Sequence, residues 1–104
     1  MSFNIEQTLK DMLKSVADVL GDEGPEVTDA LEQVLRDEKE ALQGIAEARI
    51  RGEISDDDLK DQLEDEKVAF QAGLSMAKAA SKATMQKAIN AGIDTFWKAV
   101  KVAL

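Results

Sequence analysis

The chain has 104 residues, of which 44% are hydrophobic and only 4% aromatic, and its net charge is −8. It contains no cysteine, tyrosine or histidine, which excludes disulfides, thiolate chemistry, imidazole bases and the usual zinc or haem ligands. An acidic chain also lacks the basic face that binds nucleic-acid backbones. We therefore expect a non-enzymatic protein with no cofactor and no nucleic-acid partner.

Composition predicts an all-α fold, because alanine, leucine and charged helix formers dominate and strand formers are sparse. The length is typical of one domain, so we expect a single helical domain over residues 1–104. The opening MSFNIEQTLK has no leader pattern, and no run of about 20 apolar residues follows. We expect a soluble protein, cytoplasmic by default, while export without a leader and a place inside a virus particle fit the sequence equally.

Two helices are predicted in the first half of the chain. The first spans residues 5–20, with Asn4 as its cap, Gln7 reaching back in a capping box, and Gly21 at its end. The second begins near Pro25, since proline is tolerated in a first turn. Its apolar periodicity continues to residue 51, where Gly52 ends it.

A third helix is predicted from Ser55 to residue 103. Three aspartates, at positions 56 to 58, occupy its first turn, where the exposed amides favour negative charge. Their spacing lacks the pattern of a calcium loop. Gly73 and Gly92 each weaken a helix by up to ~1 kcal/mol, but we favour one continuous helix about 70 Å long.

The arms before and after the turn have nearly equal lengths, 4–51 and 55–103, which favours a long antiparallel hairpin with a broken first arm. Opposed residue numbers would sum to about 106, placing Leu13 near Ile93, Leu9 near Trp97 and Val27 near Ala79. The alternative is a compact three-helix bundle, which the linker at Gly21 to Pro25 also permits.

The apolar stripe of these helices is too wide for one partner, because its residues often come in adjacent pairs such as Phe96 and Trp97. A two-helix rod could not cover it, so we expect the hairpin to self-associate into an oligomeric helical bundle. The residues expected at the oligomer or partner interface are Leu13, Leu20, Leu35, Leu42, Ile89, Ile93, Phe96, Trp97 and Val100.

Charge is segregated along the chain. Residues 1–66 hold seven basic and twenty acidic side chains, and residues 67–104 hold six basic and one acidic. Complementary charges flanking an apolar seam set its register. We expect the late lysines to meet early carboxylates, with Lys78, Lys82, Lys87, Lys98 and Lys101 facing Asp11, Asp18, Glu26 and Asp29.

The segment from Lys82 to Leu104 has a basic amphipathic pattern, which also occurs in helices that lie on membranes. We favour packing of its apolar face against the first helix, which has a matching stripe. Between Ala69 and Thr84, ten of sixteen residues are small. We interpret them as a site of close helix packing, with a mobile or pore-lining surface as the alternative.

Two carboxylates are candidate metal ligands. Glu38 and Glu66 interrupt apolar stripes and fall at the same height when the arms are paired. Bundles that hold two metals add histidines, which this chain lacks, so the hypothesis is a carboxylate-only site for a hard cation. The alternative is a solvated ion-paired belt with Arg36, Lys39 and Lys67.

A short acidic hairpin of this length is similar to secreted Trp-x-Gly hairpin proteins and to subunits of injection needles. The turn here reads Arg51-Gly52-Glu53 and the one tryptophan is Trp97, so neither family's motif is present. The leading hypothesis is an assembly or interaction subunit, in a homo-oligomer or a larger particle. A membrane-active or pore-forming protein and a carboxylate-only metal-binding bundle are the alternatives.

Overall fold

The computed structural model describes residues 3–21, 25–77 and 81–104, and within these ranges it has five helices and no strand. The all-α prediction is therefore confirmed. The helices are α1 (Ile5–Leu20), α2 (Pro25–Asp37), α3 (Lys39–Ile50), α4 (Asp56–Ala77) and α5 (Lys82–Ala103).

The helix ends follow the predicted caps closely. Asn4 Oδ1 accepts a hydrogen bond from the Gln7 amide at 3.1 Å, but the Gln7 side chain donates to Asp11 instead of reaching back. At the start of α4, Ser55 and Asp58 exchange side-chain to backbone hydrogen bonds of 3.1 Å, which makes a complete capping box. Gly21 at the end of α1 has a φ of 56°, a value that favours glycine.

The continuous helix predicted over residues 55–103 is wrong. Helix α4 ends at Ala77, and α5 begins at Lys82 with Ser81 as its cap, accepting from the Thr84 amide at 3.3 Å. The serine supplies a partner for a free amide of a new helix, which stabilises a helix start here. The chain stays helical through Gly73 and Gly92. The predicted contact of Val27 with Ala79 lies outside the described residues.

The second predicted helix, residues 25–51, has an interruption at Glu38. Its backbone angles are φ −99° and ψ 7°, outside the helical region. Backbone hydrogen bonds still run from the Glu38 amide to Val34 and from the Leu42 amide to Glu38, at 3.0 and 2.9 Å. Helices α2 and α3 therefore form one bent rod.

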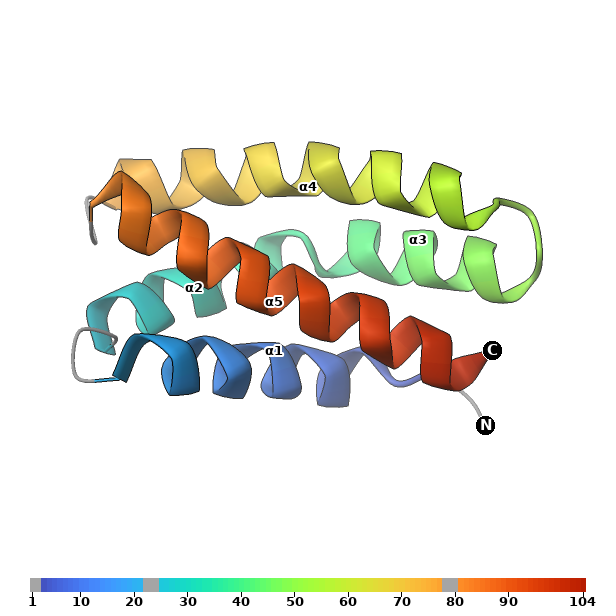
Figure 1. Cartoon of the computed structure of the whole chain (residues 1–104), viewed down its shortest axis with the longest axis horizontal. Helices are drawn as coiled ribbons and strands as arrows, with labels where there is room; N and C mark the ends of the chain where they lie inside the picture. Colours follow the sequence, from blue (N-terminus) through green and yellow to red (C-terminus); the bar gives the residue numbers. More distant parts are fainter. Residues whose placement is uncertain (1–2, 22–24, 78–80) are drawn as a thin grey trace.

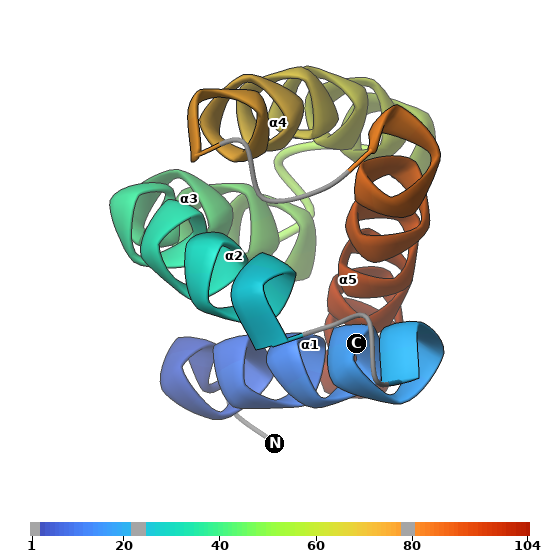
Figure 2. The same cartoon turned by 90° about the vertical axis from the view of Figure 1, so that its left-hand side faces the viewer.

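The chain crosses the molecule four times in alternating directions, as α1, then α2 with α3, then α4, then α5 (Figure 1). Viewed from the end, these rods surround a central space, with α5 between α1 and α4 and the bent rod opposite it (Figure 2). The largest Cα dimension is 38 Å, about half of the rod length expected for the hairpin. The compact alternative is thus closer, although with five helices in place of three.

One part of the predicted register is confirmed, namely the pairing of α1 with α5. The Ser15 and Thr95 hydroxyls are hydrogen-bonded at 2.7 Å. A Cβ added at Gly92 would lie 3.7 Å from Val16 and 3.8 Å from Met12. The residue numbers in each of these pairs add up to nearly the expected value of about 106. The first and last helices therefore pack against each other as the apolar pattern predicts.

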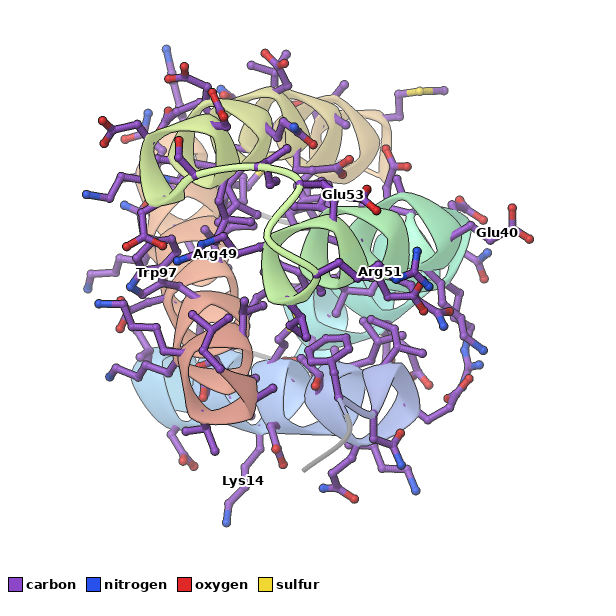
Figure 3. The ribbon with its side chains drawn as sticks, turned by 90° about the vertical axis from the view of Figure 1, so that its right-hand side faces the viewer. Lys14, Glu40, Arg49, Arg51, Glu53 and Trp97 are labelled. Carbon is purple, nitrogen blue, oxygen red and sulfur yellow. The ribbon has the colours of Figure 1, made fainter. Side chains whose placement is uncertain are left out.

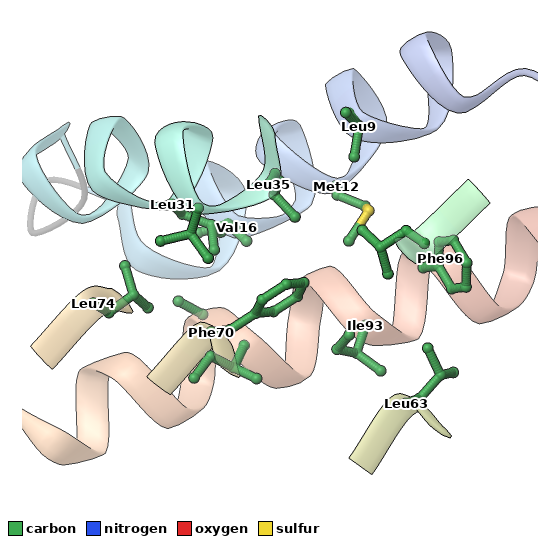
Figure 4. Close-up of a cluster of buried hydrophobic side chains, with 14 of the residues drawn as sticks. Leu9, Met12, Val16, Leu31, Leu35, Leu63, Phe70, Leu74, Ile93 and Phe96 are labelled. Atoms are coloured by element: carbon green, nitrogen blue, oxygen red, sulfur yellow. The ribbon is translucent and has the colours of Figure 1, made fainter. Parts of the chain in front are cut away.

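The core fills the space between the four rods (Figure 4). Its centre holds Phe70 and Phe96, which are 1% and 0% exposed. Phe3 packs edge-on against Phe96, with ring centres 6.0 Å apart. The other large side chains with almost no exposure are Met12, Leu31, Leu35, Leu42, Leu59, Leu74, Val16, Val27 and Val100.

The small residues of α4 permit a close approach to α2. A Cβ added at Gly73 would lie 2.6 Å from Cγ2 of Val34, closer than side chains tolerate. Gly73 is therefore a packing residue, as the close-packing interpretation of residues 69–84 predicts. Residues 78–80 of that stretch lie outside the described part of the chain.

Candidate functional site

The nine predicted interface residues lie mostly inside one chain. Seven of them are buried: Leu20, Leu35, Leu42, Ile89, Ile93, Phe96 and Val100. Only Leu13 and Trp97 are partly exposed. The four-rod arrangement buries these seven side chains in the core of one chain, which the two-rod hairpin could not do.

Glu38 and Glu66 are brought close together, as their predicted heights require. Glu66 on α4 is near enough to Glu38, at the bend between α2 and α3, to feel its charge, and its Oε2 atom is buried without a hydrogen-bond partner among the described residues. Burial raises the pKa of Glu66 to about 7, and the negative charges of Glu38 and then Asp65 add to the effect. This carboxyl group changes its charge near neutral pH.

The pair does not extend to a larger ligand set. Among residues 3–21, 25–77 and 81–104, no three acidic side chains converge to hold a metal ion. Calcium takes six to eight oxygen ligands in proteins. The three cations of the alternative, Arg36, Lys39 and Lys67, are ion-paired near the surface with Glu32, Glu6 and Glu64 respectively, and none of them pairs with Glu38 or Glu66.

A surface groove lies between α4 and α5, with a volume of about 860 Å³. Leu63, Ala91 and Ile93 form an apolar floor, and Val19 of α1 contributes one edge. Trp97 also lines it and is only partly buried. We call this hollow the α4–α5 groove. Helices α4 and α5 do not pack fully against each other here, so apolar side chains between them are accessible to solvent.

Lysines surround the α4–α5 groove, which is unusual in a chain of net charge −8. Of the carboxylates that line it, Glu64 lies 3.0 Å from Lys67, and Asp94 lies 3.2 Å from Lys98. Lys60 and Lys87 form no ion pair with any described residue. The groove thus combines an apolar floor with unpaired positive charge at its rim.

Trp97 lies where several charged side chains meet. Lys60 and Lys101 place their ammonium groups 5.6 and 4.8 Å from the centre of its ring, within the range of cation–π attraction. At the same end, Arg49 Nε donates to Asp56 Oδ1 at 2.7 Å. In Figure 3, Arg49 and Trp97 lie on the same side of the molecule, whereas Lys14 projects from α1 into solvent.

The predicted ion pairs between late lysines and early carboxylates are not among those of the described residues. Lys98 pairs with Asp94 of its own helix, and Lys101 lies over Trp97; Lys78 falls outside the described part. Pairs between different helices instead join Lys39 of α3 to Glu6 of α1, and Arg49 of α3 to Asp56 at the start of α4.

The apolar face of α5 is turned inward. Met85, Ile89, Phe96 and Val100 are buried against the rest of the bundle, as the packing interpretation of this segment predicts. In the described parts of the chain, no helix has the length and apolar character needed to cross a bilayer.

Sequence reasoning missed the α4–α5 groove, because it depends on the break after Ala77. A signal for one wall was present, since Lys60, Glu64 and Lys67 follow helical spacing beside the buried Leu63. None of the known protein families, curated proteins or solved structures compared with the chain matches it. A functional assignment must therefore start from this geometry.

Proposed function

We propose that the chain is a non-enzymatic interaction subunit that docks one amphipathic helix of a partner protein into the α4–α5 groove. The observation that carries the proposal is the groove itself, which offers an apolar floor between α4 and α5 and is open to solvent. Amphipathic helices bind grooves of this kind by laying their apolar face on the floor.

The dimensions of the groove suit a short helix. Lys87 and Trp97 line it ten positions apart on α5, which corresponds to about 15 Å, or nearly three helical turns. A helix of that length presents apolar side chains at positions i, i+3 or i+4, and i+7. Its outer face would stay in water, as an open groove requires.

The chemistry of the lining supports binding over catalysis. The ionisable groups that line the groove are lysines and two carboxylates, Glu64 and Asp94, each engaged by a neighbouring lysine. No histidine or cysteine exists in the chain to act as a base or nucleophile. The residues that line the groove can therefore attract a ligand by charge and apolar contact, but none of them resembles a nucleophile activated by a base.

The two alternatives have weaker support. A membrane-active role would need the apolar face of α5, which is occupied by the core. A metal-binding role would use the Glu38 and Glu66 carboxylates, which a third described acidic group does not join. Self-association has a basis in the exposed apolar side chains of Val68 and Met76 on α4, which are 68% and 85% exposed.

The single tryptophan makes the proposal testable, because Trp97 lines the groove and reports on it by fluorescence. A helical peptide with leucines at i, i+3, i+4 and i+7 and uncharged flanks is expected to change Trp97 emission saturably. Asn90 is exposed and lines the groove, so Asn90→Phe should fill it and weaken binding about tenfold or more.

Gln33→Phe on the exposed face of α2 provides the matched control, with wild-type affinity expected. A scrambled peptide of equal composition should not bind. Equal affinity of Asn90→Phe and wild type would count against the groove as the docking surface. Sedimentation over a dilution series tests whether a second copy of the chain occupies the groove instead of a partner helix. Such a dimer would dissociate on dilution, and the peptide would displace the second copy.

A further inference from the structure

One end of the α4–α5 groove is built from cationic side chains around a single indole ring. Lys60 comes from α4 and Lys101 from α5, and both ammonium groups lie within 5.6 Å of the centre of the Trp97 ring. Both lysine side chains are exposed, and neither forms an ion pair with a described residue. The two helices that wall the groove thus each contribute one unpaired cation.

A carboxylate near these two lysines, Asp56, is paired with an arginine and forms no ion pair with either lysine. Asp56 is held by Arg49 at 2.7 Å, and that hydrogen bond is the main reason that the pKa of Asp56 is lowered. Lys101 and Lys60 lower it further by charge attraction alone, without an ion pair to Asp56. Two lysines that no described carboxylate engages favour a ligand that brings negative charge.

The indole ring strengthens the attraction of these two ammonium groups for an anion. An ammonium over an aromatic face is partly shielded from water on that side, and its attraction to an incoming anion is less screened than in open solvent. Toward the other end the groove is lined by Lys87, ten positions earlier on α5, and by Lys67, which is paired with Glu64. The Trp97 end is therefore the more strongly cationic of the two.

We propose that the partner helix carries carboxylate side chains at the end that lies on Trp97, where Lys60 and Lys101 receive them. The proposal rests on the proposed function, because Lys60 and Trp97 line the same groove and Lys101 lies over the Trp97 ring. It identifies the partner as an amphipathic helix with an acidic end, and it fixes the direction in which that helix lies.

The test uses two helical peptides with the same leucine stripe, one with two glutamates at one end and one with glutamines in their place. Calorimetry measures their affinity for three full-length proteins: wild type, Lys60→Ala with Lys101→Ala, and Lys10→Ala with Lys14→Ala. The last double variant removes the same charge from exposed positions of α1 that do not line the groove. Circular dichroism checks that each protein keeps its helical content and melting temperature.

Wild type is expected to bind the glutamate peptide about tenfold more tightly than the glutamine peptide, from two carboxylate–ammonium contacts. That preference should vanish in the Lys60→Ala, Lys101→Ala protein and persist in the α1 control, because only the former removes the receiving groups. Equal affinity of wild type for both peptides, or a preference that survives loss of both groove lysines, would overturn this inference and leave the proposed function intact. Failure of both peptides to bind wild type would overturn both.

Discussion

The carboxyl group of Glu66 is partly buried and lies near a second carboxylate, that of Glu38. Its pKa rises from 4.5 to about 7 in the folded chain. Between these two values the folded state binds more protons than the unfolded state, so the free energy of unfolding falls as pH rises. The decrease begins near pH 4.5 and is complete above pH 7.

Glu66→Gln should therefore stabilise the chain at pH 8 and have little effect at pH 4.5. A glutamine resembles the protonated acid and avoids the cost of a partly buried charge. Solvent screening at this half-buried position limits the gain to about 1 kcal/mol. Urea unfolding at both pH values measures it, with Glu40→Gln on the exposed face of α3 as the control. A gain of the same size at both pH values would contradict this account of Glu66.

Gly73 is a residue whose missing side chain matters. Gly73→Ala places a methyl group 2.6 Å from Val34, whose branched side chain is 9% exposed and has little room to turn. We expect a loss of about 1 to 2 kcal/mol in unfolding free energy, since overpacking exceeds the better helix propensity of alanine. In a Val34→Ala background the same change should cost much less.

Gly44→Ala is the matched control for that substitution, because nothing lies within 4 Å of the position that a Cβ would occupy there. It should stabilise α3 by up to ~1 kcal/mol. Denaturant midpoints compare wild type, Gly73→Ala, Gly44→Ala, Val34→Ala and the double variant. A destabilised Gly44→Ala protein, or a stable Gly73→Ala protein, would refute the assignment of close contact to Gly73 alone.

Among the elements, helix starts were easier to predict than helix interruptions. Asn4 and Ser55 precede apolar periodic runs and cap α1 and α4 as expected. Ser81 caps α5 just as directly, but alanines surround it and no proline or glycine accompanies it. Good helix formers on both sides concealed the break, since propensity alone favours continuity across it.

Ser81→Ala should lower the stability of the chain by about 1 kcal/mol, because the first turn of α5 loses the acceptor for the Thr84 amide. Ser81→Asp should retain most of the wild-type stability, as aspartate caps equally well. Thermal unfolding followed by circular dichroism measures both. Wild-type stability in Ser81→Ala would mean that tertiary packing alone determines where α5 begins.

For the whole molecule, the decisive difference from the predicted hairpin is length. The Cα radius of gyration is 13.1 Å, whereas a rod about 70 Å long has one of about 20 Å. Small-angle scattering at low protein concentration should give a value close to the former. A value near 20 Å that persists on dilution would favour the extended hairpin instead.

The candidate site was predictable only where it did not depend on the break between α4 and α5. Glu38 and Glu66 were expected at one height and are close in space, because both belong to the rods on either side of the Gly52 turn. Lys60 and Trp97 are 37 positions apart, which in a continuous helix means about 55 Å. In the folded chain the lysine ammonium lies 5.6 Å from the indole centre, a proximity that no pattern of periodicity contains.

The pairing of α1 with α5, which joins hydroxyl groups 80 positions apart at Ser15 and Thr95, also bears on synthesis of the chain. Because α1 is synthesised well before α5, the apolar side chains of Met12 and Val16 stay exposed to solvent until α5 has left the ribosome. Contacts between segments so far apart in sequence also form slowly and late in folding. In the nascent chain, molecular chaperones would therefore bind chiefly to the first helix.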